Sequence, residues 1–255
     1  MQQVFEPITS PPAFRCFPRG ATPSRAAAFA VGFVLVLVAT AMPRAAPAET
    51  AMPSVIDGDT VQTADGIHHL AGIDAPELGQ RCRQAGRWIR CGQDAAFALH
   101  RVLSLSLAPL VCTPLPDRSP AADGSRVSTC AIDGRKDIAQ VLLSQGLAIA
   151  LKDAPSAYRE AEENARAANL GLWRTEFVRP TDWRKGRRLP DDPVVDPPPC
   201  PIKATTDADG HRLYLVPLDA AYAALPDEAV EARYCSDEDA AADGWRRPPI
   251  GVPQR

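Results

Sequence analysis

The sequence lacks the usual features of a zinc protein and of a basic nucleic-acid binder. It has no CxxC pair and no histidine at zinc-ligand spacing from a cysteine, which excludes a zinc cluster of the usual type. Positive charge is scarce too, because residues 49–255 contain 24 Lys and Arg against 30 Asp and Glu, a formal charge of −6. Binding of nucleic acid through a broadly basic surface is therefore excluded, and any phosphate must be recognised by local cations and a metal.

The sequence also lacks an apolar run of full membrane-spanning length near its start. Residues 26–41 are almost wholly apolar, but a membrane-spanning helix needs roughly 20 such residues. The run follows three arginines and leads into small residues, which is the order of an export signal. We therefore expect residues 1–48 to be a signal peptide, removed after Ala41 or Ala48, and the protein to be secreted or periplasmic. The alternative is a retained N-terminal membrane segment that anchors the protein.

An even number of cysteines follows this leader. Six cysteines in an exported chain favour disulfides, with free buried thiols as the alternative. Six cysteines allow 15 pairings. We favour the sequential pairing, because each pair then lies within one local unit: Cys82 with Cys91, Cys112 with Cys130, and Cys200 with Cys235.

Periodicity and turn signals predict strands and helices in alternation. Residues 54–62 and 67–73 are extended around the turn Thr63-Ala64-Asp65-Gly66, which indicates a hairpin. A polar loop is expected to hold Cys82 and Cys91. The remaining expected elements are strands at 110–113 and 127–132, and helices at 93–105, 137–144 and 156–169.

A proline-rich stretch divides the chain. Residues 186–199 contain five prolines and no periodicity, so residues 185–199 are expected to form a semi-rigid linker. The linker would separate a domain at residues 53–184 from a small unit at residues 200–247. A unit of under about 50 residues needs a staple in order to fold, and the last predicted disulfide would supply one.

Acidic residues gather around the predicted hairpin. Asp57 and Asp59 are two apart on an extended segment, so they share a face, and the hairpin returns the chain to Asp74 and Glu77. Hard oxygen ligands suit calcium or magnesium, and a metal beside a glutamate can activate water and neutralise a phosphodiester. Taken singly, the Asp57-Gly58 and Asp74-Ala75-Pro76 segments are more typical of turns. Their occurrence around one hairpin favours a metal site.

These motifs resemble those of a known family. The segments VIDGDTV, HLAGIDAPE, DGSR and GLA…GLW are similar to the pattern of the thermonuclease, or micrococcal-nuclease-like, family over residues 54–184. The resemblance implies an α+β fold, a five-stranded OB-fold β-barrel with three helices, that cleaves DNA or RNA with calcium. The stapled C-terminal unit is similar to a module found in some exported members.

The resemblance implies an exported, calcium-dependent endonuclease that hydrolyses phosphodiester bonds. Nucleic acid is the expected partner, and we expect a monomer because no feature demands a protein partner. The alternative is a catalytically silent OB-fold module that binds nucleic acid or has a structural role.

The resemblance also assigns roles to individual residues. Asp59 and Asp74 match the metal ligands, joined by the backbone carbonyl of Ala75, with Asp57 as an outer carboxylate. Glu77 matches the general base that takes a proton from the attacking water.

The phosphate-binding residues depart from the family pattern. Arg126 matches a guanidinium that holds the phosphate, although the loop before it is one residue shorter than in the family. His69 stands where the family has a second catalytic arginine, and imidazole offers fewer donors than a guanidinium. Losing one such donor typically costs about 100- to 1,000-fold in rate. The family's base-stacking tyrosines are also absent, so Lys152 and Tyr158 are expected to contact the substrate.

Overall fold

The computed structural model describes residues 52–250, apart from residue 122 and residues 193–199. The predicted signal peptide lies outside the described residues. Within the described part of the chain, none of the helices could span a membrane.

The predicted hairpin is the centre of a six-stranded sheet. Its two strands, β2 and β3, are antiparallel, and β3 continues the sheet by pairing in parallel with β8. In sheet order the strands are β1 (Ser54–Val55), β2 (Thr60–Thr63), β3 (Gly66–Leu70), β8 (Arg126–Ile132) and β7 (Leu110–Pro114), with β9 (Lys136–Asp137) beside β8.

A separate pair of short strands carries the second acidic motif. β4 (Ile73–Asp74) pairs antiparallel with β10 (Ile149–Ala150), and Asp74 lies opposite Ile149. The fold is thus mixed α and β. Because β4 and β10 pair with each other and, among the described residues, with no strand of the six-stranded sheet, closure into a five-stranded barrel stays an expectation from the family resemblance.

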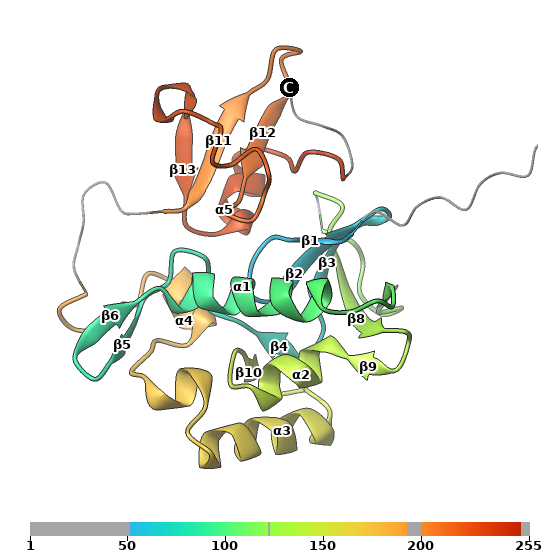
Figure 1. The fold of residues 1–255 in the computed structure, drawn as a ribbon, viewed down its shortest axis with the longest axis vertical. Helices are drawn as coiled ribbons and strands as arrows, with labels where there is room; N and C mark the ends of the chain where they lie inside the picture. The colour runs from blue at the N-terminus through green and yellow to red at the C-terminus, as the bar shows by residue number, and fades with distance from the viewer. Residues whose placement is uncertain (1–51, 122, 193–199, 251–255) are drawn as a thin grey trace, which may run out of the picture. The chain divides into compact units, whose positions relative to one another are not determined.

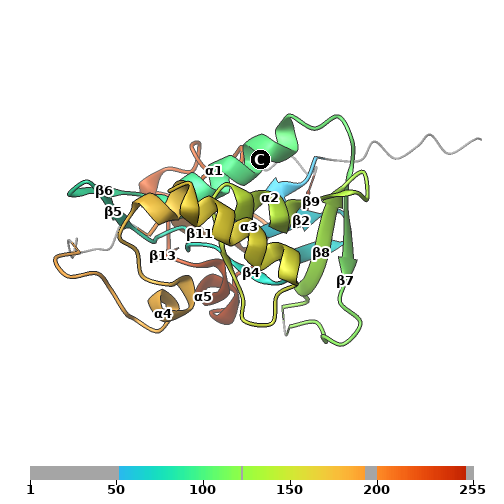
Figure 2. The same ribbon diagram turned by 90° about the horizontal axis from the view of Figure 1, so that it is seen from below.

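The three expected helices are present as α1 (Cys91–Ser104), α2 (Ile138–Ser144) and α3 (Ser156–Ala167). The carboxylate of Asp137 caps α2 by accepting from the Gln140 N–H at 3.2 Å, as the sequence predicts. α2 and α3 lie side by side in both views (Figures 1 and 2). The apolar faces of these helices supply much of the core, including Leu99, Ile138 and Leu142.

Two further elements depart from the expectations. The prediction of a polar loop around Cys82 and Cys91 is wrong, because β5 (Cys82–Gln84) and β6 (Arg87–Ile89) pair as a hairpin in this segment. Ala85 and Gly86 form its two-residue turn with φ of 48° and 77°, the left-handed geometry of a tight hairpin. A short helix, α4 (Pro180–Arg184), follows the last predicted helix, and its proline occupies the first turn, where the missing N–H is harmless.

The C-terminal module, residues 200–250, has its own sheet. Its strands β11 (Ile202–Thr206), β12 (Arg212–Leu215) and β13 (Ala232–Tyr234) are antiparallel in the order β12-β11-β13, followed by α5 (Asp237–Ala242) (Figure 1). Buried Ile202, Tyr214 and Trp245 belong to the same apolar cluster as the core around α1 and α2. The module therefore packs continuously against the preceding domain.

The sequential disulfide pairing is confirmed. Cys82 pairs with Cys91, Cys112 with Cys130 across the β7–β8 ladder, and Cys200 with Cys235. The bonds close segments of 9, 18 and 35 residues. Cross-links of this kind typically stabilise a fold by about 2 to 4 kcal/mol each, chiefly by restricting the unfolded chain.

Candidate active site

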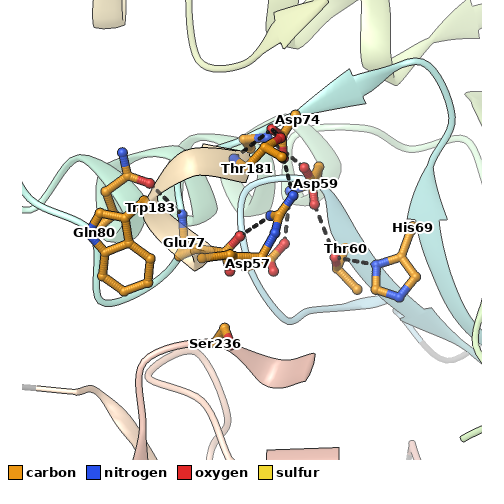
Figure 3. A network of polar contacts seen from close by, with 12 residues as sticks. Asp57, Asp59, Thr60, His69, Asp74, Glu77, Gln80, Thr181, Trp183 and Ser236 are labelled. Atoms are coloured by element: carbon orange, nitrogen blue, oxygen red, sulfur yellow. Dashed lines mark hydrogen bonds and ion pairs between the residues drawn. The ribbon is translucent and has the colours of Figure 1, made fainter. Parts of the chain in front are cut away.

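Two loops bring the predicted carboxylates together (Figure 3). Asp57 accepts the N–H of Asp59 at 2.9 Å, and Asp59 Oδ2 accepts the N–H of Ala75 at 2.6 Å, which ties the first loop to the second. Glycine at position 58 is required for this approach, since a Cβ there would lie 2.8 Å from the Cβ of Ala75. The convergence of Asp57, Asp59 and Asp74 expected from the hairpin is therefore present.

α4 supplies a cation to this cluster from a distant part of the sequence. Arg184 Nη2 donates to Asp74 Oδ1 at 2.9 Å, and its Nη1 donates to Glu77. Thr181 donates to Asp74 Oδ2 from its hydroxyl at 2.6 Å and from its backbone N–H at 3.1 Å. These two residues were not among the candidates from the sequence, although they lie within residues 54–184, which resemble the family.

Glu77 is almost completely removed from solvent, with 2% of its surface exposed. The chain is pressed against it, because a Cβ at residue 92 would lie 1.6 Å from the Glu77 carbonyl oxygen, so only glycine fits there. Burial, together with repulsion from the carboxylates of Glu238 and Asp57, raises the pKa of Glu77 to about 9 despite its contact with Arg184.

Asp59 shows the same crowding of negative charge. Burial is the main cause that raises the pKa of Asp59 well above its ordinary value, and repulsion from Asp57 and Glu77 adds to it. The site thus holds more carboxylates than the single guanidinium of Arg184 can balance, and additional positive charge or protons would stabilise it.

His69 supports Asp59 rather than facing outward. Its Nδ1 is 3.0 Å from the Thr60 hydroxyl, and that hydroxyl donates to Asp59 Oδ1 at 3.1 Å (Figure 3). Its Nε2 is 3.3 Å from the hydroxyl of Ser125. The imidazole therefore belongs to a hydrogen-bonded chain that ends on a predicted metal ligand.

The structure contradicts the expected position of Arg126. Its guanidinium donates to the carbonyl of Asp65 at 2.8 Å, at the hairpin turn and away from the carboxylates. Ser125 takes the place beside His69. The register of β3 with β8 pairs His68 with Arg126 and His69 with Val127, so Ser125 shares a face with His69 while Arg126 lies on the opposite face.

The two predicted substrate-binding residues differ in exposure: Tyr158 is buried and Lys152 is exposed. Tyr158 is 6% exposed, donates to Asp137 Oδ2 at 2.6 Å, and packs against Gly72, where a Cβ would lie 3.1 Å from the tyrosine ring. The enclosed ring argues against the predicted contact of Tyr158 with the substrate. Lys152 is exposed just beyond β10, and its contact with substrate stays a prediction.

Comparison with known proteins identifies the family of the chain. The family described as "Staphylococcal nuclease homologue" matches residues 68–175. The chain is also similar to the succinoglycan biosynthesis protein ExoI of Rhizobium meliloti (strain 1021), with 34% identity over 140 residues, which cover 52% of this chain and 69% of that protein. The chain therefore belongs to the staphylococcal nuclease homologue family.

Proposed function

We propose that the protein is an exported phosphodiester hydrolase that cleaves DNA or RNA with the help of a divalent cation, calcium in the first instance. The observation that carries the proposal is the convergence of Asp57, Asp59, Asp74 and Glu77 from two loops around one guanidinium. Family membership supports it, because the matched residues include Asp74 and Glu77.

The residues fit a hard cation. The side chains are carboxylates, which suit calcium or magnesium rather than softer metals, and their mutual repulsion favours an added positive charge. Asp59, Asp74 and the backbone carbonyl of Ala75 would hold the ion, with Asp57 as an outer carboxylate. When bound, such an ion neutralises phosphate charge and makes its water easier to deprotonate.

The chain's own residues then have separate roles in the proposed reaction. Glu77 would accept the proton of the attacking water. Its pKa is about 9 even beside Arg184, so the positive charge of the cation would be needed to lower that pKa toward the working range. Beyond its bonds to Asp74 and Glu77, Arg184 donates to no other described residue, and the proposal assigns its remaining N–H groups to phosphate oxygens, in place of the arginine that His69 replaces. His69 and Thr60 hold Asp59 in position.

Export is part of the same proposal. The three disulfides support an oxidising compartment, either the periplasm or the medium, because such bonds are rare in the cytosol. The export signal expected at residues 1–48 is the proposed route.

The direct test is a cleavage assay with purified protein on single-stranded DNA and on RNA. We expect cleavage in calcium that stops when EGTA is added. The Glu77→Gln variant, prepared in parallel, measures the background from contaminating nucleases. Cleavage by the wild type that is no faster than that of Glu77→Gln would remove the proposal.

A second candidate is a silent module that binds nucleic acid without cutting it. Two observations favour it. His69 and Ser125 lie next to each other, at positions where the family resemblance implies phosphate-binding arginines. Glu77 is also buried away from solvent. Fluorescence anisotropy with a labelled oligonucleotide separates the two candidates. The module would bind the oligonucleotide and leave it intact in the cleavage assay.

The position of Arg126 predicts that it does not hold the phosphate, contrary to the role that the family resemblance implies. Arg126→Ala is expected to leave the cleavage rate within about twofold of the wild-type rate, because the guanidinium rests on the Asp65 carbonyl. The measurement is kcat/KM on a short single-stranded substrate. A fall of about 100-fold would mean that Arg126 reaches the phosphate after all.

A further inference from the structure

The C-terminal module adds a third buried carboxylate next to two from the site. Asp237, the first residue of α5, is 5% exposed. One carboxylate oxygen from each of Asp57, Glu77 and Asp237 lies within 4.8 Å of the other two. In Figure 3, Ser236, the residue that precedes Asp237, lies below Asp57 and Glu77.

Two of these carboxylates have an oxygen with no partner. Glu77 Oε2 and Asp237 Oδ1 are buried and receive no hydrogen bond from any described residue. Buried polar atoms are nearly always paired, and leaving one unpaired is costly. An acidic cluster alone would be unremarkable, but two orphaned oxygens in the same buried space indicate a missing positive partner.

The module is held firmly in this position. Ser236 caps α5 by accepting the Asp239 N–H at 3.3 Å, and the Gly79 N–H donates to the carbonyl of Cys235 at 3.0 Å. A Cβ at residue 79 would lie 2.7 Å from the Cys235 Cβ, so only glycine allows this approach. The Cys200–Cys235 disulfide fixes the same segment to β11. Asp237 thus faces Glu77 because of tight packing rather than a loose surface contact.

The two nearby arginines compensate the negative charge of the cluster only in part. Arg184 is occupied by Asp74 and by the other oxygen of Glu77, and the nearby buried Arg247 pairs with Asp219. Burial, with repulsion from Asp57 and Glu238, raises the pKa of Asp237 well above its ordinary value. Such a group is stabilised either by retained protons or by a bound cation.

We infer that Asp57, Glu77 and Asp237 form a binding site for a hard divalent cation such as calcium, which ties the C-terminal module to the carboxylate loops. The site shares Asp57 and Glu77 with the carboxylates of the proposed active site, and Asp237 is the ligand that the C-terminal module adds. Asp59 and Asp74 are not among its three ligands. Binding there requires no catalysis, so the inference does not depend on the proposed nuclease activity.

The test is titration of the purified protein with calcium chloride and with magnesium chloride, by calorimetry and by thermal melting. At a calcium concentration about 100 times the dissociation constant, the melting temperature is expected to rise by about 5 °C or more. Asp237→Asn should weaken binding by about tenfold or more and remove most of that rise. Asp239→Asn is the matched control, because it makes the same change on an exposed residue of the same helix turn.

Further variants separate this site from the one at Asp59. Asp59→Asn is expected to retain the rise that depends on Asp237. In EDTA near neutral pH, Asp237→Asn should melt at a higher temperature than the wild type, because the variant buries one crowded carboxylate fewer. If Asp237→Asn does not fold, Glu77→Gln provides the same comparison.

Two results would overturn the inference. One is an Asp237→Asn protein that keeps the full calcium-dependent rise in melting temperature. The other is a wild-type protein whose melting temperature does not respond to either cation, which would mean that the carboxylates share protons instead. The first result leaves the proposed cleavage untouched. The second would also argue against a calcium ion at Asp59 and Asp74, and the cleavage assay with Glu77→Gln then decides whether the protein is a nuclease.

Discussion

In the presence of a chelator, the protein is expected to lose stability steadily as the pH rises from about 5 to about 9. Glu77 has a pKa of about 9 in the folded state against an ordinary value of 4.5, so between these values the folded chain holds a proton that the unfolded chain has released. Stability falls with pH wherever the unfolded state binds fewer protons.

The expected size of this effect is large. The stabilisation that protonated Glu77 provides is fully present below pH 4.5 and is lost as the pH approaches 9. At about 1.4 kcal/mol for each pH unit, the total is on the order of 5 kcal/mol, a large part of the stability of an ordinary domain. Asp59 and Asp237, whose pKa values are also raised, change stability in the same direction.

Urea unfolding in EDTA at several pH values between 5 and 9 measures this slope. Glu77→Gln should flatten the slope and raise stability at pH 8, although it weakens the contact with Arg184. Glu176→Gln is the control, because Glu176 pairs with Arg83 at the surface and its pKa is lowered rather than raised. A wild-type protein that is equally stable at pH 5 and 9, or a Glu77→Gln variant that is less stable at pH 8, would contradict the prediction.

Arg184→Gln is expected to lower the rate of nucleic-acid cleavage by about 100- to 1,000-fold, the usual cost of losing one oriented donor to a developing charge. Among the described residues, Arg184 is the one guanidinium in contact with both Asp74 and Glu77. Its side chain is 34% exposed, so part of it is accessible to a substrate while the carboxylates hold the rest.

The measurement is kcat/KM for Arg184→Gln and for Arg184→Lys, with Arg187→Gln as the control. Lysine keeps the charge but lacks the planar fork, so Arg184→Lys should recover only part of the rate. Arg187 is 70% exposed and pairs with Asp182, so its replacement should change little. A melting curve for each variant shows whether it is folded at the assay temperature. If folded Arg184→Gln cleaves at nearly the wild-type rate, Arg184 serves only to balance the buried carboxylates.

Much of the secondary structure was predictable from the sequence because its signals are local. The β2–β3 turn, the Asp137 cap and the periodicity of α1 and α3 each depend on residues a few positions apart. The sequential disulfides follow from the same locality, since both cysteines of each pair lie in one short unit. The approach of Asp59 to Asp74 was predictable too, because a single hairpin joins them.

The failures came from features that neighbouring residues do not encode. Whether Arg126 or Ser125 faces His69 depends on how β8 aligns with β3, and a shift of one residue reverses the answer. The enclosure of Tyr158 depends on how α3 packs over Gly72. Neither outcome can be read from the spacing of motifs.

The sequence by itself determined the family, the paired carboxylates and the cysteine framework, because each is a pattern within short segments of chain. The tertiary structure alone decided which charges meet those carboxylates. Arg184 and Asp237 lie more than 100 residues along the chain from Glu77, and only the docking of α4 and α5 places one positive and one negative charge beside it. Chain segments so far apart are brought together by packing of the whole core, which no local pattern records.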